Sequence, residues 1–406
     1  MLRFAPTPNG DMHIGDLQVA LFNYVVAKQK QEDFIVRIED IDKEKNTDKK
    51  DTEILDILAL FGIEYSQVIN QSQNIRFHTA MALQLMHEKK AFSCFCSDEW
   101  LEKKYQEAKE ANKTYKYDDA CRNLPPELVI DNTNPFSIRI VRPDGDLDAD
   151  DAVDSFIIMN QDKTPTYDFA CAVDDMLSDI SLVIRNKNYL DNTPKQEHVR
   201  DMLGYDKKIE YIHLPFIQEE VSVKELLEDG YLPSAISNYL ISTNHKIFNM
   251  QDAIKDFNLD DISDSPTRFS LDTLKEINKE HLKQLDAVEL SRYVGFADAD
   301  IGELAKVYLE DVSTTKELKT KIKPIFESKQ IPKEYEESAL AITKSVKDAP
   351  YFEKYDDFKR YIMDKTKLKE DEFCKTFRYL LTGLDSGPDM QEIYGCLKNY
   401  IGEIIK

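Results

Sequence analysis

Hydrophobic and polar positions alternate with two different periods in the first part of the chain. Short continuous apolar runs at 2–4 and 34–38 predict buried strands, and apolar residues at helical spacing predict helices over 17–26 and 52–61. The same alternation returns over 154–220. Strands that alternate with helices predict an α/β fold built on a parallel sheet.

Two other stretches depart from this alternation. Residues 71–153 are more polar and combine a charged helix over 99–112 with a clear strand at 136–140, so we interpret them as an inserted α+β module. From about residue 222, amphipathic helical patterns follow one another along the chain. We therefore expect an α/β domain, an inserted α+β domain and an all-helical C-terminal half.

Composition and charge narrow the class of protein. The 406 residues suffice for two to four domains, and the net charge is −23, from 76 acidic and 53 basic residues. Taken alone, this charge argues against a nucleic-acid partner, although a basic groove on one face is compatible with it. The chain has no run of 18 apolar residues and no signal-peptide pattern, so we expect a cytoplasmic protein without a membrane segment. Six cysteines fit a reducing compartment.

The first strand runs into a two-proline turn that ends at Pro8 and leads to a helix. Gly10 and Gly15 allow the backbone to approach a bulky group, and we expect Asp11 to cap the helix. The N-terminus of a helix presents free N–H groups to a phosphate, and His13 would lie beside that position. By itself, this pattern also fits an ordinary turn with a solvated histidine.

Longer motifs give these residues a context. The stretch Arg3-Phe4-Ala5-Pro6-Thr7-Pro8-Asn9-Gly10, followed by His13-Ile14-Gly15, resembles the first signature of class I aminoacyl-tRNA synthetases in its glutamyl form. The run 37–42, Arg-Ile-Glu-Asp-Ile-Asp, follows at the spacing of that family, with isoleucine in place of the usual threonine. The segment 165–175 is again similar to glutamyl-tRNA synthetases, and 377–383 resembles the anticodon-binding helices of bacterial members.

The resemblance implies ATP-dependent attachment of glutamate to tRNA through glutamyl-adenylate, with Mg²⁺ entering with ATP. The acceptor would be tRNA-Glu or tRNA-Gln, and the enzyme would be monomeric. The resemblance implies a Rossmann-like catalytic domain over 1–70 and 154–220, with an acceptor-binding insertion over 71–153. A stem-contact domain over 221–300 and an anticodon-binding domain over 301–406 would follow.

The resemblance also assigns roles to individual residues. The catalytic residues would be His13 and Gly15. The residues that would hold glutamate are Arg3, Thr7, Glu39, Tyr167 and Arg185. The residues that would hold the nucleotide are Pro8, Gly10, His13, Gly15 and Tyr189. By position alone, the acidic run that contains Glu39 fits a polar strand end as well as a binding site.

A possible zinc site lies in the inserted module. Cys94 and Cys96, with Cys121 after twenty-four further residues, match the spacing of a zinc site in some relatives. There the last ligand is a histidine two residues after the third cysteine, where this chain has Asn123. Because an amide is a poor zinc ligand, we favour buried free thiols over a metal site.

The second signature of the family is missing. A mobile loop with the sequence Lys-x-Ser-Lys-Arg, whose lysine stabilises the triphosphate, should lie between Glu220 and Ser222, but Val221 joins these flanks directly. In addition, 186–188 reads Asn-Lys-Asn where relatives usually carry an acidic pair. Either a mobile loop is left out of the sequence, or the protein is a paralogue that binds tRNA or adenylate without efficient activation. A nucleotide-binding α/β enzyme with an unrelated helical appendage is an alternative from another class.

Overall fold

The computed structural model describes residues 1–145, 147, 152–241, 247–262 and 265–405. It divides into two compact units. The first unit comprises Met1–Glu220 with Gln251–Arg268, and the second comprises Val221–Met250 with Phe269–Lys406. Within the described residues, no helix is long and apolar enough to cross a membrane.

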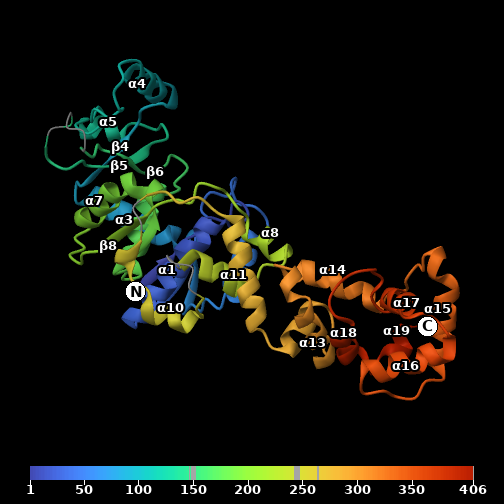
Figure 1. Ribbon diagram of the computed structural model, residues 1–406. Helices are drawn as coiled ribbons and strands as arrows, with labels where there is room; N and C mark the ends of the chain where they lie inside the picture. The colour runs from blue at the N-terminus through green and yellow to red at the C-terminus, as the bar shows by residue number, and fades with distance from the viewer. Residues whose placement is uncertain (146, 148–151, 242–246, 263–264, 406) are drawn as a thin grey trace. The chain divides into compact units, whose positions relative to one another are not determined.

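The strands of the first unit form two sheets (Figure 1). A five-stranded parallel sheet has the order β3-β2-β1-β7-β8, with bounds β1 Leu2–Phe4, β2 Phe34–Ile38, β3 Gln67–Asn70, β7 Leu182–Asn186 and β8 Glu210–Leu214. An antiparallel sheet has the order β4-β5-β6, with bounds β4 Ala91–Cys94, β5 Ser137–Ile140 and β6 Ile157–Met159. The parallel sheet confirms the predicted α/β architecture.

The helices of the first unit are α1 Ile14–Lys30, α2 Lys50–Leu60, α3 Ile75–His87, α4 Asp98–Glu110, α5 Pro126–Ile130, α6 Tyr167–Leu177 and α7 Thr193–Met202. Helix α10 Met250–Asp256 also belongs to this unit, except for its first residue. The short 3₁₀ segments of this unit are η1 Gln71–Asn74, η2 Lys187–Asn192 and η3 Leu259–Asp261. The second unit contains α8 Val223–Glu228, α9 Pro233–Ile241, α11 Leu271–Gln284, α12 Ala287–Tyr293, α13 Ala299–Val307, α14 Thr315–Phe326, α15 Glu336–Lys347, α16 Tyr355–Thr366, α17 Glu370–Thr382, α18 Met390–Leu397 and α19 Ile401–Ile404, with η4 Leu309–Asp311 and η5 Lys333–Tyr335. This unit is helical, as predicted.

Helix α1 packs on the centre of the parallel sheet. Its buried positions are almost continuous, which fits a helix that contacts β1, β2 and β7. The fully buried Asn23 donates from Nδ2 to the carbonyl of Val19, at 2.8 Å, and to that of Ile184 in β7, at 3.0 Å. A buried amide that is hydrogen-bonded to a neighbouring strand fixes the helix against the sheet.

The prediction that Asp11 caps α1 was wrong. The N-cap residue is His13, whose backbone N–H donates to Oδ2 of Asp16 at 3.3 Å. The carboxylate of Asp11 instead pairs with Lys50. Because His13 has an extended backbone, the first helical turn begins directly after it.

The antiparallel sheet shares a hydrophobic core with α3, α6 and α7. β6 lies in the interval 154–220, yet it pairs with β5 rather than with the parallel sheet. At the edge of this core, the buried carboxylate of Asp174 accepts hydrogen bonds from Gln71, Asn74 and His78, at 2.8 to 2.9 Å. These bonds hold η1 and α3 against α6.

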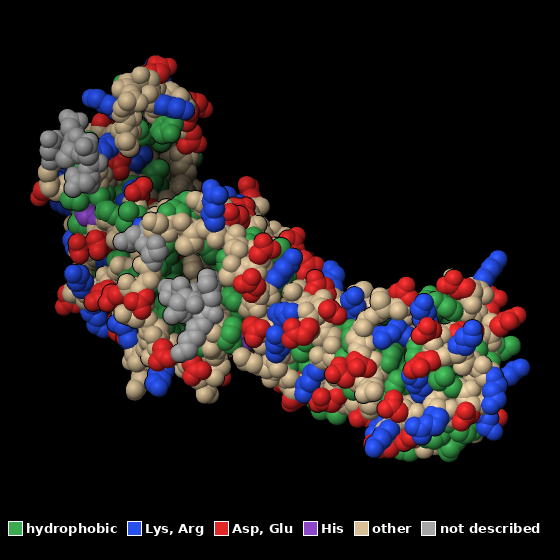
Figure 2. Space-filling view, in the orientation of Figure 1, with side chains coloured by type: hydrophobic (Ala, Val, Ile, Leu, Met, Phe, Trp, Pro, Cys, Tyr) green, Lys and Arg blue, Asp and Glu red, His purple; other side chains and the backbone are tan. Residues whose placement is uncertain are grey.

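The second unit has its own helical core. Helices α12 and α13 approach each other closely at Gly302, where an added Cβ would lie 1.7 Å from the carbonyl oxygen of Ala287. On the face drawn in Figure 2, Lys and Arg side chains of this unit are interspersed with Asp and Glu. Neither sign of charge thus forms a continuous patch on this face of the unit.

We predict that Gly302→Ala destabilises the second unit by about 3 kcal/mol, because the methyl group displaces backbone atoms of α12. Alanine has the higher helix propensity, by about 1 kcal/mol, so propensity alone predicts the opposite sign. Urea unfolding followed by circular dichroism measures the difference.

Gly395 in α18 provides a matched control. It is exposed and helical, and an added Cβ meets no atom within 4 Å. Gly395→Ala should therefore be neutral or slightly stabilising. Equal effects of the two substitutions would contradict the close approach at Gly302.

Candidate active site

The order of the parallel sheet marks where a ligand binds. From β1 the chain moves outward to β2 and β3 on one side, and it later adds β7 and β8 on the other side. In such sheets ligands bind beyond the carboxyl ends of the strands at the point where the order reverses, here between β1 and β7. These strands pair through Leu2 and Leu182, at their amino ends.

A pocket of about 230 Å³ lies at this point. The turn after β1, the start of α1 and the segments after β2 and β7 all contribute to its wall. Its lining residues are Arg3, Phe4, Ala5, Pro6, Thr7, Asn9, Gly10, Asp11, Met12, Asp16, Val19, Glu39, Ile54, Tyr167, Arg185, Asn186 and Tyr189. The lining includes seven of the ten residues predicted from the sequence.

Three predicted residues, Pro8, His13 and Gly15, are not part of the lining. Pro8 is buried, and His13 and Gly15 lie at the start of α1. An added Cβ at Gly10 or Gly15 would meet no atom within 4 Å, so open space borders both glycines. A bulky ligand at the start of α1 would fit beside them.

A buried network of opposite charges lies beneath the pocket. The fully buried Asp175, near the C-terminal end of α6, accepts from Nη1 of Arg37 at 2.5 Å and from Nε of Arg3 at 3.3 Å. Nη2 of Arg37 lies 3.5 Å from Oε1 of Glu39, and Sγ of Cys171 donates to the same oxygen at 3.2 Å. Two carboxylates thus neutralise two guanidinium groups.

These contacts affect the two carboxyl groups differently. Although burial alone would raise it, Arg37 and Arg3 lower the pKa of Asp175 to about 2. Burial raises the pKa of Glu39, and Arg37 only partly opposes this shift. Asp175 is therefore the permanent anion that holds Arg3 at the pocket wall.

Arg185 has a different environment. It is 95% buried, and it donates from Nη1 to Gln196 at 2.9 Å, from Nη2 to Thr193 at 2.7 Å and from Nε to Nε2 of His213 at 3.3 Å. All three acceptors are neutral, and among the described residues Arg185 forms no ion pair. Burial and the nearby Arg3 lower the pKa of Arg185. An anionic ligand would supply the missing negative charge.

Two tyrosines border the pocket beside Arg185. The rings of Tyr167 and Tyr189 are stacked, with centroids 5.8 Å apart and an interplanar angle of 29°. Cζ of Arg185 lies 5.9 Å from the Tyr189 centroid. Both rings are partly exposed, so each is available to a ligand.

The acidic run after β2 separates into different roles. Glu39 lines the pocket, whereas Asp40 accepts from Asn70 and Ser72 at the start of η1. Asp42 is exposed and pairs with Lys45 at 2.9 Å. Only the first of the three carboxylates is thus placed to meet a ligand.

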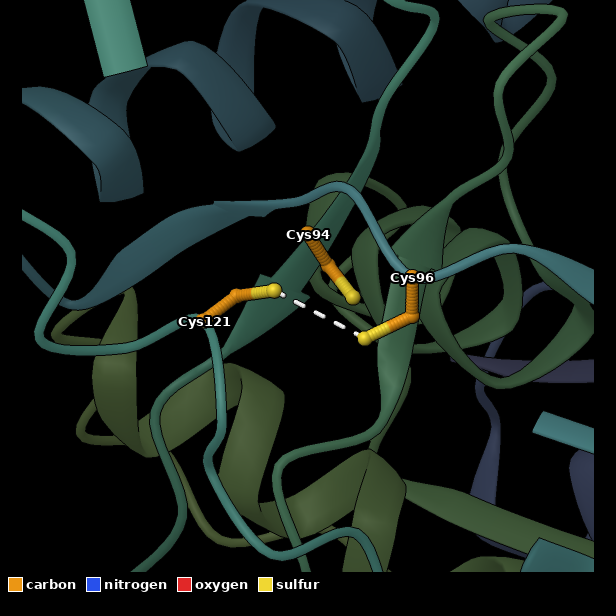
Figure 3. A group of neighbouring side chains, drawn as sticks. All are labelled: Cys94, Cys96 and Cys121. Carbon is orange, nitrogen blue, oxygen red and sulfur yellow. Dashed lines mark hydrogen bonds between the residues drawn. The ribbon is translucent and has the colours of Figure 1, made fainter. Parts of the chain in front are cut away.

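The three cysteines of the inserted module lie together (Figure 3). The Sγ atoms of Cys94, Cys96 and Cys121 are all within 4.8 Å of one another. The Oη of the fully buried Tyr117 lies 3.5 Å from the sulfurs of Cys94 and Cys96, and it accepts from the backbone N–H of Cys121 at 3.0 Å. Nε of Arg139 also donates to Sγ of Cys94 at 3.3 Å, so Tyr117 and Arg139 are polar neighbours of the thiols, whereas Asn123 is exposed.

Several functional neighbours were not predicted. Arg37 and Asp175 are separated by 138 residues, and no local pattern pairs them. Thr193, Gln196 and His213 contact Arg185 from two other elements. The sequence offered no local signal for Gln196, because it is fully buried although its neighbours Lys195 and Glu197 are charged.

We predict that Asp175→Asn lowers the free energy of unfolding by about 3–5 kcal/mol at pH 7, because two buried guanidinium groups lose their shared anion. Folding lowers the pKa of Asp175 from about 4 in the unfolded chain to about 2. The ionised carboxylate therefore stabilises the fold at any pH above about 4, and this contribution is lost as the pH falls from about 4 towards 2. The difference in the free energy of unfolding between Asp175→Asn and wild type, measured by urea unfolding, should therefore become smaller below about pH 4. The exposed Asp42→Asn is the control, and a similar loss in both variants would contradict the network.

Comparisons with known proteins agree with this geometry. Residues 1–276 match the family described as tRNA synthetases class I (E and Q), catalytic domain. Glutamate--tRNA ligase 2 of Sulfurimonas denitrificans is 57% identical, and glutamate--tRNA ligase 1 of Nitratiruptor sp. is 45% identical, each with all of both chains covered. Both matches extend over 432 residues, 26 more than the 406 of this chain, so these relatives carry residues with no counterpart here.

The fold of this chain is also similar to that of a solved glutamate tRNA ligase. A crystal structure of a glutamate tRNA ligase from Elizabethkingia meningosepticum in complex with its amino acid superimposes with a TM-score of 0.78 at 21% identity, covering 99% of this chain and 97% of that one. The family match covers more than half of the chain, and the relatives match its full length. The chain therefore belongs to the class I tRNA synthetases (E and Q), and its resemblance to glutamyl-tRNA synthetases is confirmed.

Proposed function

We propose that this protein attaches glutamate to tRNA at the expense of ATP, through glutamyl-adenylate. The observation that carries the proposal is Arg185, a buried guanidinium at the pocket wall with three neutral acceptors and no acidic partner among the described residues. A ligand with a side-chain carboxylate neutralises it, and a carboxamide does not.

The pocket orients glutamate from two sides. The side-chain carboxylate binds Arg185, with Arg3 nearby but already held by Asp175. Tyr167 adds a hydroxyl at the same wall. The hydroxyl of Thr7 and the carboxylate of Glu39 face the α-amino end, because an ammonium group needs oxygen acceptors.

Activation then requires alignment and charge stabilisation. The α-carboxylate of glutamate attacks the α-phosphate of ATP, forming a C–O–P bond and releasing pyrophosphate. The first-turn N–H groups of α1, beside Gly10 and Gly15, and the imidazole of His13 stabilise the charge that develops on the phosphates. Tyr189 stacks on the adenine, and Mg²⁺, which enters with ATP, neutralises phosphate charge.

The backbone passes directly from Glu220 through Val221 to Ser222, at the position expected for the second signature. The sequence therefore shows no lysine pair of that signature at this position, and the matches to the two relatives extend over 26 positions more than this chain has. Glutamate binding and adenylate formation are separate properties of this chain and need separate measurements. Binding without activation would favour the non-catalytic alternative.

The remaining parts of the protein serve tRNA in this proposal. Residues 71–153 hold the acceptor end, 221–300 contact the stem, and 301–406 read the anticodon of tRNA-Glu or tRNA-Gln. Unstacked loop bases and RNA shape are the features that such modules recognise. We expect a monomer in the cytoplasm.

Arg185→Ala should raise the KM for glutamate about a hundredfold and leave the KM for ATP unchanged, because a buried charge pair with the substrate is lost. The assay is glutamate-dependent pyrophosphate exchange in the presence of tRNA, with equilibrium dialysis of labelled glutamate alongside. Arg76→Ala, on the exposed face of α3, is the matched control. Wild-type protein that neither binds glutamate nor exchanges pyrophosphate would refute the proposal.

The cysteine cluster also fits the zinc site that the resemblance suggested. Three thiols supply three donors, although the sequence had favoured free thiols. Burial raises the pKa of the Tyr117 phenol, which is not a usual zinc ligand, so a fourth ligand would come from solvent. Zinc would connect β4 to the segment that carries Cys121 and would add a structural cross-link to the inserted module.

We predict about one zinc per chain in protein purified without chelator, measured by inductively coupled plasma mass spectrometry. Cys96→Ser should lower the zinc content, because a hydroxyl is a poorer ligand than a thiolate. Cys396→Ser in α18 is the control and should leave the content unchanged. Wild-type protein without zinc, in which all six thiols react with a thiol reagent after denaturation, would support free cysteines.

A further inference from the structure

His213 lies directly opposite Arg185 in the parallel sheet. β7 and β8 pair in a register that aligns these two residues. Nε of Arg185 donates to Nε2 of His213 at 3.3 Å, and Oγ1 of Thr193 lies 3.2 Å from the same nitrogen. Thr193 in turn accepts from Nη2 of Arg185 at 2.7 Å. The three side chains form a closed triangle of hydrogen bonds.

This triangle fixes the orientation of the guanidinium group. Arg185 has five N–H groups, of which His213, Thr193 and Gln196 take one each. Among the described residues no other group accepts from Arg185, which leaves two N–H groups for a ligand. Because Nε2 of His213 accepts the Arg185 hydrogen bond, the imidazole proton is assigned to Nδ1.

The surroundings of His213 favour its neutral form. The charged or titratable groups that face it are Arg185, Lys187 and Tyr211, whose ring stacks on the imidazole at 6.0 Å and 7°. Burial, followed by Arg185 and Lys187, lowers the pKa of His213 below its ordinary value. The imidazole thus accepts a hydrogen bond without neutralising Arg185.

We propose that His213 is a positioning residue for glutamate: as a neutral acceptor, it holds the Arg185 guanidinium in the orientation that leaves two N–H groups for the substrate carboxylate. This inference rests on the proposed function. An acidic residue at the same position would hold the guanidinium equally well but would compete with glutamate for its charge. A neutral acceptor avoids this competition.

Two substitutions separate the acceptor from the ring. His213→Phe keeps the aromatic ring against Tyr211 and removes the acceptor, whereas His213→Gln keeps an acceptor and removes the ring. His213→Phe should raise both the glutamate dissociation constant and the KM for glutamate about tenfold, the effect of losing a hydrogen bond to a charged group. kcat and the KM for ATP should change less than twofold. His213→Gln should stay within about threefold of wild type in all these quantities.

Acidification is a second readout, which a purely structural role would not affect. Protonated His213 presents an N–H to the Nε–H of Arg185, so the hydrogen bond is lost and the two cations repel. The KM for glutamate of wild type should therefore rise as the pH falls from 7.5 to 5.5, and that of His213→Gln should not. His87→Phe, at the exposed end of α3, is the control for the substitution itself.

The outcomes are distinguishable. Equal glutamate affinity of His213→Phe and wild type, or a His213→Gln variant as weak as His213→Phe, overturns the positioning role while the proposed function stands. If circular dichroism shows that His213→Phe does not fold, the pH dependence of wild type and His213→Gln decides, and parallel profiles overturn the inference. Wild-type protein that binds no glutamate by equilibrium dialysis overturns the proposed function itself.

Discussion

The sharing of Asp175 between Arg3 and Arg37 is the interaction on which the site depends. Buried guanidinium groups are tolerated only when anions or several acceptors surround them. Asp175 and Glu39 balance Arg3 and Arg37, which fixes the wall of the pocket at β1 and β2. Arg185 lies outside this balance. Among the described residues, Arg185 is therefore a guanidinium at the pocket wall without an acidic partner, in contrast to Arg3.

The topology explains why this charge lies where a nucleotide can also bind. The order of the sheet reverses between β1 and β7, so the ends of both strands and the start of α1 meet at one place. Arg3 comes from β1 and Arg185 from the end of β7, while the open N-terminus of α1 lies between them along the chain. An acid group and a phosphate can thus be held side by side by elements whose positions the sheet determines.

The sequence predicted what depends on local pattern. The continuous apolar run of β2 was placed correctly at 34–38, whereas β3 and β8, each with exposed or half-exposed residues, carry no comparable pattern. Motif resemblance found Arg3 and Arg185 but not their partners, because Asp175 and His213 become neighbours only through the sheet and α6. The N-cap of α1 was misassigned because aspartate is a common capping residue and Asp11 lies just before the helix. The structure shows that the extended backbone of His13 makes it the N-cap, with Asp16 in the first turn.

The neutrality of the groups around Arg185 has a consequence for selectivity. If its partners were carboxylates, as those of Arg3 and Arg37 are, glutamate would have to displace an internal anion and would gain little over glutamine. Thr193, Gln196 and His213 orient the guanidinium without neutralising its charge. Asp168 influences Arg185 only indirectly, because its carboxylate accepts from Nε2 of Gln196 at 3.2 Å. This bond directs the oxygen of the Gln196 amide towards Arg185. The cost of burying Arg185 is therefore relieved when a carboxylate enters, and a neutral amide, which brings no charge, leaves that cost in place.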